Sequence, residues 1–356
     1  MSSHPKKLIL VIGATGAQGL AVIDALLSPS ESNTPSPYAV RALTRDVSGK
    51  RAKELAARGV ELIEGRSDDP SAVARALGGA YGAFVNTNGS GIGEMAEIYT
   101  GIRIFEIAKR MPTLRHYIWS NLRHVSKNAG FDPDYRAEHM DGKGRVGEWL
   151  QAQESSATED GLAWSTVTTG PYMDMLKGGM FRPLNIREDG TVVFAAPVGD
   201  GKVPLIALKD LGWWARYSFD HRKQVSGKEL NVTSERVSWD HLVKSPAAPR
   251  YTNASHLRTG SLFSTPRRSR SPLANELRPG ANTTTLGQNL SCFWRVLRDD
   301  IIDKDMAWIT RTHPGTYTLE RWMREEGYTG SEETVLKSGE DGKFNWKTDK
   351  AKTALL

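Results

Sequence analysis

Apolar runs alternate with amphipathic stretches over the first half of the chain. The run at 8–12 predicts a buried strand, and the pattern LAVIDALL at 20–27 predicts the helix after it. Further strands are expected at 38–45, 60–65, 81–86, 114–120 and 162–170, with helices at 50–59, 70–77, 94–110 and 143–152. Such alternation is typical of a parallel sheet covered by helices on both faces. We therefore predict an α/β fold with a doubly wound parallel sheet.

The alternation loosens after the sixth strand, which suggests a second, smaller lobe of mixed α/β structure. We place a dinucleotide-binding domain at 1–170, a substrate or partner lobe at 171–330 and a polar tail at 331–356. The block 171–243 keeps ordinary globular patterning, with a turn at Gly190, and the sheet of the first domain could receive further strands from 190–235.

Residues 245–271 break this patterning. They are rich in Ser, Thr, Pro and Arg and show neither helical nor strand periodicity. We expect them to form no packed structure, because they offer too little apolar burial to offset the entropy of ordering. Three interpretations stay open: a disordered basic insertion, a phosphorylatable or nuclear-targeting loop around PRRSRS, or translation of a retained intron or shifted frame.

The charge of the chain is concentrated in this same segment. The whole chain carries a net charge of +6, and five arginines within 245–271 account for five of those charges. The folded body is therefore nearly neutral, which argues against direct nucleic-acid binding. The lone cysteine, Cys292, cannot form an internal disulfide, and no apolar run is long enough to span a bilayer. We expect a soluble protein of the cytoplasm or nucleus, with no metal site and no membrane partner.

Three glycines follow the first strand at intervals of three residues: Gly13, Gly16 and Gly19. Glycine at such a turn lets the backbone approach a pyrophosphate, whose charge then meets the N-terminus of the following helix. A dinucleotide is therefore the first ligand to consider. The alternative is a glycine-rich turn that serves only structure.

The end of the second strand usually selects the cofactor, because an acid there binds a ribose hydroxyl and an arginine accepts a 2′-phosphate. Here the strand ends at Thr44 and Arg45, which favours NADP(H), with NAD(H) left open by Asp46. Arg45 could also be an ordinary solvated arginine. After the third strand, one of Asp68 and Asp69 is expected to hold the adenine edge and the other to cap a helix.

The ends of the fourth and fifth strands carry small polar residues. Asn86, Thr87 and Asn88 follow the fourth strand, and Ser120 and Asn121 end the fifth. Ligands of doubly wound sheets bind at the carboxyl ends of the strands, so these side chains should border the cofactor's ribose and nicotinamide. Otherwise they are turn residues alone.

His139 and Lys143 lie four residues apart, on one face of a predicted helix. Short-chain dehydrogenases carry Tyr-x-x-x-Lys here, where the lysine binds ribose and lowers the pKa of the tyrosine that protonates the substrate. In this chain histidine takes the tyrosine position, and an imidazole is a different acid from a phenol. A chance pair of surface residues is the alternative.

Together GATGAQG, LTR, NTN, WSNL and HMDGK resemble the NmrA-like family, atypical members of the extended short-chain dehydrogenase superfamily found widely in fungi. The resemblance covers about 5–243 and about 272–330. It implies a Rossmann domain, NAD(P) binding and either redox-sensing regulation of transcription factors or an oxidoreductase activity. The cofactor-binding residues that we expect are Gly13, Thr15, Gly16, Gln18, Gly19, Arg45, Asp68, Asn86, Thr87, Asn88, Ser120, Lys143, Pro171 and Tyr172.

Two departures from the family pattern matter. Arg66 stands where the family has an Asp after the glycine that ends the third strand, which weakens the expected adenine contact. Residues 245–271 also lack the strand and amphipathic helix that the family would supply. Our first hypothesis is an NADP-binding sensor that controls a protein partner. The alternatives are an NADPH-dependent reductase of a carbonyl or enone, with His139 as proton donor and Ser120 or Asn86 orienting substrate, and a compromised pseudo-enzyme.

Overall fold

The structure is a computed structural model that describes residues 5–29, 33–245, 251–253, 284–331, 333 and 337. The chain divides into two compact units. The first consists of Met1–His124, His139–Thr169 and Leu211–Asn231, and the second of Val125–Glu138, Gly170–Asp210 and Val232–Leu356. The chain therefore crosses between the units several times.

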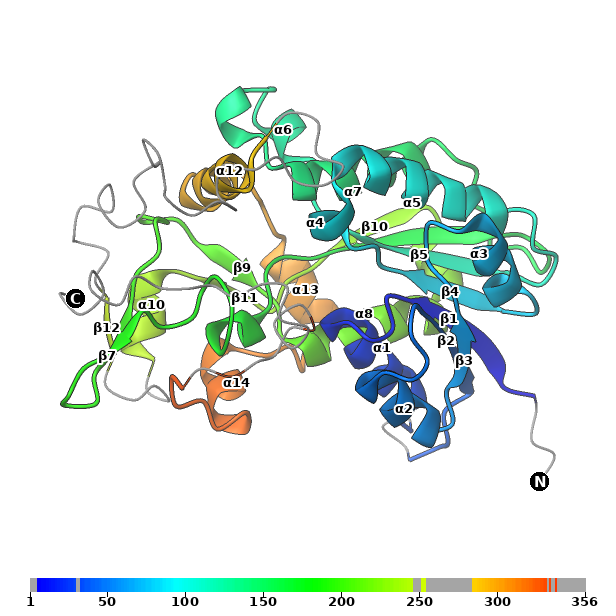
Figure 1. Cartoon of the computed structure of the whole chain (residues 1–356), viewed down its shortest axis with the longest axis horizontal. Coiled ribbons are helices and arrows are strands. Elements are labelled where there is room, and N and C mark those ends of the chain that lie inside the picture. The colour runs from blue at the N-terminus through cyan, green and yellow to red at the C-terminus, as the bar shows by residue number, and fades with distance from the viewer. Residues whose placement is uncertain are drawn as a thin grey trace. The chain divides into compact units, whose positions relative to one another are not determined.

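Seven parallel strands form the sheet of the first unit, in the order β10-β6-β5-β4-β1-β2-β3 (Figure 1). Every residue of β4, β5 and β6 is buried, as expected of central strands that are covered on both faces. The strands are β1 Lys7–Ile12, β2 Tyr38–Thr44, β3 Glu61–Glu64, β4 Gly82–Val85, β5 His116–Asn121, β6 Ala163–Thr168 and β10 Lys228–Asn231. The predicted doubly wound parallel fold is confirmed.

Helices cover both faces of this sheet (Figure 1). On one face α3, α5 and α7 share an apolar core with the strands, built around Phe105, Trp119 and Val146. On the other, α1 and α8 lie so close that a Cβ on Gly212 would overlap the carbonyl of Ala21. The helices are α1 Ala17–Leu27, α2 Lys50–Ala57, α3 Pro70–Leu77, α4 Gly89–Ile92, α5 Glu94–Ala108, α7 Glu138–Gln151, α8 Leu208–Asp220 and α9 Arg222–Val225.

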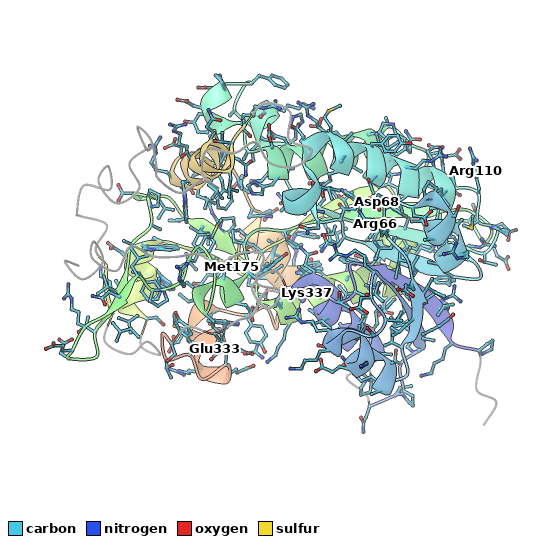
Figure 2. All side chains as sticks on the ribbon, viewed as in Figure 1. Arg66, Asp68, Arg110, Met175, Glu333 and Lys337 are labelled. Atoms are coloured by element: carbon cyan, nitrogen blue, oxygen red, sulfur yellow. The ribbon has the colours of Figure 1, made fainter. Side chains whose placement is uncertain are left out.

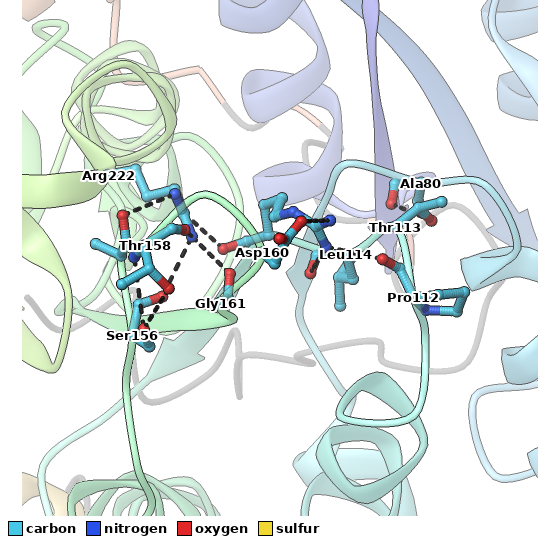
Figure 3. Close-up of polar contacts among 11 residues, drawn as sticks. Ala80, Pro112, Thr113, Leu114, Ser156, Thr158, Asp160, Gly161 and Arg222 are labelled. Carbon is cyan, nitrogen blue, oxygen red and sulfur yellow. Dashed lines mark hydrogen bonds and ion pairs between the residues drawn. The ribbon is translucent and has the colours of Figure 1, made fainter.

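Arg222 of α9 ties the loop before β6 to the sheet (Figure 3). Its Nη2 donates to the carbonyls of Gly161 at 2.6 Å and Thr158 at 2.9 Å, and its Nε donates to the carbonyl of Arg115 at 2.7 Å. The guanidinium thus joins two carbonyls of the loop to the Arg115 carbonyl, which also accepts from the Ala163 amide of β6 at 2.9 Å. The loop leads directly into β6, so this contact helps to fix the strand's position.

The second unit holds two small sheets and short helices. Strands β9 and β11 pair antiparallel, while β8 pairs antiparallel with β7 and parallel with β12. The strands are β7 Asn185–Ile186, β8 Val192–Phe194, β9 Val203–Leu205, β11 Glu235–Val237 and β12 Tyr251–Asn253. The helices are α6 Val125–Asn128, η1 Pro133–Tyr135, η2 Met173–Leu176, α10 Trp239–Lys244, α12 Leu286–Arg298, α13 Met306–Thr312 and α14 Leu319–Glu325.

A buried carboxylate organises the second unit. Asp210 is 1% exposed and accepts from His313 Nε2 at 2.8 Å, from the Tyr317 amide at 2.8 Å and from the Ser234 hydroxyl. Thr316 Oγ1 donates to the same side chain at 3.2 Å. Four donors on one carboxylate offset the cost of burying its charge, so we assign this cluster a structural role.

The structure differs from the sequence-based expectation at two places. Helix α7 begins at Glu138 rather than near 143, because its glycines do not interrupt the helix. Within 245–271, Tyr251–Asn253 forms a strand on β8, in contrast to the expected lack of regular structure. Residues 246–250 and 254–271, which hold the arginines and PRRSRS, lie outside the described residues.

Candidate functional site

The glycine turn after β1 has the geometry that the spacing predicted. Gly13 has φ +84°, and a Cβ there would lie 2.6 Å from the Asn86 carbonyl oxygen at the end of β4. A Cβ on Gly19 would overlap the carbonyl oxygen of Gly13. Only glycine combines this left-handed backbone with such close approach. The turn therefore brings bare backbone to the carboxyl edge of the sheet.

Helix α1 starts at this turn with an open N-terminus. The N-cap residue is Gly16, which makes no side-chain capping hydrogen bond, and no acidic residue occupies the first turn. The exposed amide dipoles of such a helix start favour an anion. Gln18 does not face this opening freely, because its Oε1 accepts from the buried hydroxyl of Ser120 at 2.6 Å. The contact joins two predicted site residues, and it uses the single proton of the Ser120 hydroxyl as a hydrogen-bond donor.

Two arginines follow β2, one directly after the strand and one on α2. Arg45 is exposed directly after β2. Arg51, on α2, donates from Nη1 to the Thr15 carbonyl at 2.9 Å and is thereby anchored at the turn. Asp46, the acid that left NAD(H) open, accepts from the Ser48 amide and hydroxyl at 2.8 and 2.6 Å. The sequence analysis missed Arg51, because in the sequence it is one of several basic residues on a predicted exposed helix.

The end of β3 holds a paired arginine and aspartate (Figure 2). Arg66 Nε and Nη2 donate to the two carboxylate oxygens of Asp68 at 2.8 and 2.7 Å. This pairing holds the pKa of Asp68 below its usual range and raises the pKa of Arg66. Asp69 instead caps α3, accepting from the Ser71 amide at 2.9 Å. Of the two aspartates, Asp69 is therefore the one that caps the helix, as was predicted for one of them.

A hollow of about 200 Å³, which includes its open mouth, lies beside Asp68. Its wall combines polar groups of the β3–α3 turn with one side of α5, where Thr100 and Ile104 are buried and Tyr99 is exposed. The lining residues are Ser67, Asp68, Pro70, Val73, Tyr99, Thr100, Arg103, Ile104 and Ile107. The hollow is therefore small and open, with a wall that is mostly apolar and carries a few polar groups.

Lys143 of α7 reaches the end of β4. Its Nζ donates to Asn86 Oδ1 at 3.1 Å, to the Thr87 carbonyl at 3.0 Å and to Thr87 Oγ1 at 3.2 Å. It also pairs with Glu97 Oε1 at 3.1 Å and lies 5.0 Å from the centre of the Trp119 ring. The ammonium is therefore held at the strand end by four acceptors. Lys143 is buried, with 7% of its surface exposed.

Glu97, which the sequence analysis missed, completes this cluster. It is fully buried on α5, and the Thr87 hydroxyl donates to its Oε1 at 2.6 Å. Acids in the first turn of a helix usually serve the helix dipole at the surface. Glu97 could not be recognised as a site residue from the sequence, because only the packing of α5 against α7 brings its carboxylate to Lys143.

A second polar network lies at the ends of β5 and β6. Asn121 Nδ2 donates to Thr168 Oγ1 at 2.9 Å, and Thr168 Oγ1 donates to Glu229 Oε1 at 2.6 Å. Arg123 Nη1 closes the chain on Glu229 Oε2 at 3.0 Å. The side-chain oxygen Oδ1 of Asn121 is buried without a hydrogen-bond partner among the residues that the structure describes. The network fixes the rim of the sheet next to Ser120.

The remaining predicted residues are placed as follows. His139 is half-buried in the first turn of α7, one turn before Lys143. Asn88 is exposed and precedes α4, whose first hydrogen bond runs from the Ile92 amide to the Asn88 carbonyl at 3.2 Å. Pro171 and Tyr172 belong to the second unit, where the Ile206 amide donates to the Pro171 carbonyl at 2.9 Å.

Two absences are also relevant to the chemistry. Over the described ranges, no group of three or more His, Cys, Asp or Glu side chains is arranged to hold a metal ion. In the same part of the chain, no helix has the length and apolar character needed to cross a membrane.

The sequence model of the NmrA-like family matches residues 5–246. The NmrA-like family domain-containing oxidoreductase cpsB of Aspergillus campestris is 32% identical over 259 residues, which cover 68% of this chain and 72% of that protein. An NAD(P)H azoreductase of Xenophilus azovorans is 30% identical over 205 residues, or 57% of this chain and 60% of its own length. The chain thus spans less than two thirds of the azoreductase that it matches.

Solved structures agree on the fold. NmrA, described as a negative transcriptional regulator in complex with NAD, superposes with a TM-score of 0.66 at 20% identity, covering 90% of this chain and 95% of NmrA. Its complex with NADP has a TM-score of 0.63 at 20% identity and the same coverage. The NADPH-dependent quinone oxidoreductase QOR2 of Escherichia coli, complexed with NADPH, has a TM-score of 0.60 at 17% identity, covering 90% and 99%.

Proposed function

This chain belongs to the NmrA-like family, and on that premise we propose that it binds NADP(H) and lets the bound state control a protein partner. The proposed partner is a regulator of transcription, met in the cytoplasm or nucleus. The NADP(H) complexes of NmrA and QOR2, which share the fold, support the choice of ligand.

The residues of the first unit fit a dinucleotide. The cradle at Gly13 and Gly19 is one that a Cβ would fill, and the uncapped start of α1 offers amide donors to the pyrophosphate. We assign the 2′-phosphate to Arg45 and Arg51, whose guanidinium groups bind phosphate through charge-assisted hydrogen bonds. The adenine ring is assigned to the hollow beside Asp68. When bound, the dinucleotide can supply or accept a hydride.

One observation favours a role as a sensor over a role as a catalyst. The Lys143 ammonium is engaged by a buried carboxylate and three further acceptors. In a reductase of this fold the lysine's positive charge lowers the pKa of the neighbouring proton donor. Here the charge of Glu97 cancels that effect, the donor position is His139, and the Ser120 hydroxyl is bonded to Gln18. The cluster therefore favours holding a ribose in place over moving a proton.

The second candidate is an NADPH-dependent oxidoreductase that acts on a carbonyl or enone. The relatives' names favour it, since cpsB is described as an oxidoreductase and the bacterial relative as an azoreductase. In this role His139 would donate the proton, Lys143 would hold the ribose, and Asn86 would orient substrate. A half-buried imidazole is able to serve as a proton donor at neutral pH.

Steady-state turnover separates these candidates. Purified protein is mixed with NADPH and a panel of aldehydes, ketones, enones, quinones and azo dyes, and absorbance at the NADPH band is followed. The sensor predicts saturable NADPH binding with turnover below about one per minute, far under the median enzyme rate of about 10 per second. A rate of several per second on any member of the panel would instead establish the oxidoreductase.

A further inference from the structure

The carboxylate of Glu97 is the counter-ion of Lys143. Its Oε1 lies 3.1 Å from Lys143 Nζ and accepts from the Thr87 hydroxyl at 2.6 Å. Lys143 is 7% exposed and Glu97 is 0% exposed. Two opposite charges that are both removed from water interact far more strongly than a surface pair.

Glycines close over this carboxylate from two helices. A Cβ on Gly89 of α4 would overlap the Glu97 carboxylate, and a Cβ on Gly142 of α7 would lie 3.1 Å from Glu97 Oε2. Among the residues that the structure describes, Glu97 Oε2 is buried with no hydrogen-bond partner. A purely structural carboxylate would gain from a second donor, so this arrangement retains the negative charge at a cost. The charge itself is therefore the feature to explain.

We propose that Glu97 is a specificity-determining residue that sets the relative affinity for oxidised and reduced dinucleotide. The inference rests on the proposed binding of NADP(H), with Lys143 at the nicotinamide ribose. Oxidised nicotinamide carries one more positive charge than the reduced ring. An uncompensated Lys143 would repel the oxidised ring selectively, whereas the neutral Lys143–Glu97 pair leaves both states able to bind.

A charge cycle tests this proposal. Calorimetry gives dissociation constants for NADP⁺ and NADPH with the wild type, Glu97→Gln, Lys143→Met and the double variant. Glu97→Gln should weaken NADP⁺ relative to NADPH about tenfold, as expected for one added charge at close range. Lys143→Met should shift the ratio of the two dissociation constants the other way. The double variant should restore the wild-type ratio.

Glu94→Gln is the matched control. Glu94 is buried one turn earlier on α5 and pairs with Arg145 at 3.4 Å, but Arg145 is 39% exposed and its charge is screened by solvent. For Glu94→Gln, the ratio of the dissociation constants of NADP⁺ and NADPH should equal that of the wild type. If Glu97→Gln does not fold, Lys143→Met carries the test alone.

The outcomes are distinct. If Glu97→Gln, or Lys143→Met in its place, changes both affinities in parallel or leaves the ratio unchanged, Glu97 is only structural and the inference is overturned. If the wild type binds neither NADP⁺ nor NADPH, the proposed function fails instead, and the inference falls with it.

Discussion

Arg66 and Asp68 form a bidentate ion pair at the end of β3, with donor to acceptor distances of 2.8 and 2.7 Å. This pair occupies the carboxylate that the sequence assigned to the adenine edge. The arginine stands where the family has an aspartate, and it bonds the Asp68 carboxylate within the chain. Both side chains are exposed, at 61% and 43%.

Arg66→Ala tests what this pair does. An exposed pair contributes at most about 1 kcal/mol, so the free energy of unfolding should change by less than that. The freed Asp68 carboxylate should then accept from adenine and strengthen NADPH and NADH equally, by about threefold for a modest hydrogen bond. Calorimetry with both dinucleotides gives the answer. Weaker binding of both would show that Arg66 itself contacts the ligand.

Arg45→Ala should weaken NADPH at least about tenfold and leave NADH nearly unchanged, because a guanidinium to phosphate contact is charge-assisted. Arg51→Ala should act in the same direction. Arg58→Ala is the matched control, since this arginine also lies at α2 but pairs with Asp24. Fluorescence titration with both dinucleotides measures the selectivity. Equal loss of NADPH and NADH in Arg45→Ala would remove it as the selector.

Gly13→Ala should abolish binding of both dinucleotides. Its Cβ would lie 2.6 Å from the Asn86 carbonyl oxygen and would fill the turn. Gly59→Ala separates this from backbone strain, because Gly59 has φ +81° with nothing within 4 Å of its Cβ. Both variants should lose about 1 kcal/mol or more of stability, but only Gly13→Ala should lose binding in calorimetry. Loss of binding in both would point to general destabilisation.

His116 should make the protein sensitive to acid. It is buried at the start of β5, and burial, followed by the charge of Arg222, lowers its pKa to about 3. The unfolded chain binds this proton near pH 6.5, so stability is retained above pH 6.5 and falls as the pH drops toward 3. Between pH 7 and 5 the residue should cost about 2 kcal/mol, measured by urea unfolding. In His116→Gln the free energy of unfolding should fall by about 2 kcal/mol less between pH 7 and pH 5. An unchanged dependence on pH would contradict the assignment to His116.

The fold and the glycine turn were predictable because their signals are local. A buried strand reads as an apolar run, and Gly13 is required by a left-handed turn whatever the rest of the chain does. The start of α7 was predicted too late, since Gly142 lowers helix propensity just before the predicted start. In the structure this glycine permits close packing, because a Cβ on Gly142 would lie 3.1 Å from Glu97 Oε2. Such tertiary reasons are invisible in a single sequence.

The charge partners in the site were not predictable for the same reason. Glu97 and Lys143 meet only when α5 and α7 pack on one face of the sheet. Arg51 reaches Thr15 only once α2 has folded beside the turn. Strand β10 has a short sequence of mixed polarity, as befits a sheet edge, and was anticipated only as one of several strands from 190–235.

His139→Phe tests the oxidoreductase alternative. The sensor predicts that turnover of NADPH is slow in the wild type and no slower in the variant, because no proton passes through the imidazole. NADPH affinity, measured in parallel by calorimetry, should change by less than about threefold, the effect of a modest contact. A robust wild-type rate that collapses in the variant would identify His139 as the proton donor.

The central claim is that the first unit binds NADP(H), and calorimetric titration of the purified full chain with NADPH tests it most directly. We predict saturable binding of one NADPH per chain, tighter than that of NADH under the same conditions. No saturable binding of NADPH at millimolar concentration, or tighter binding of NADH, would contradict the account.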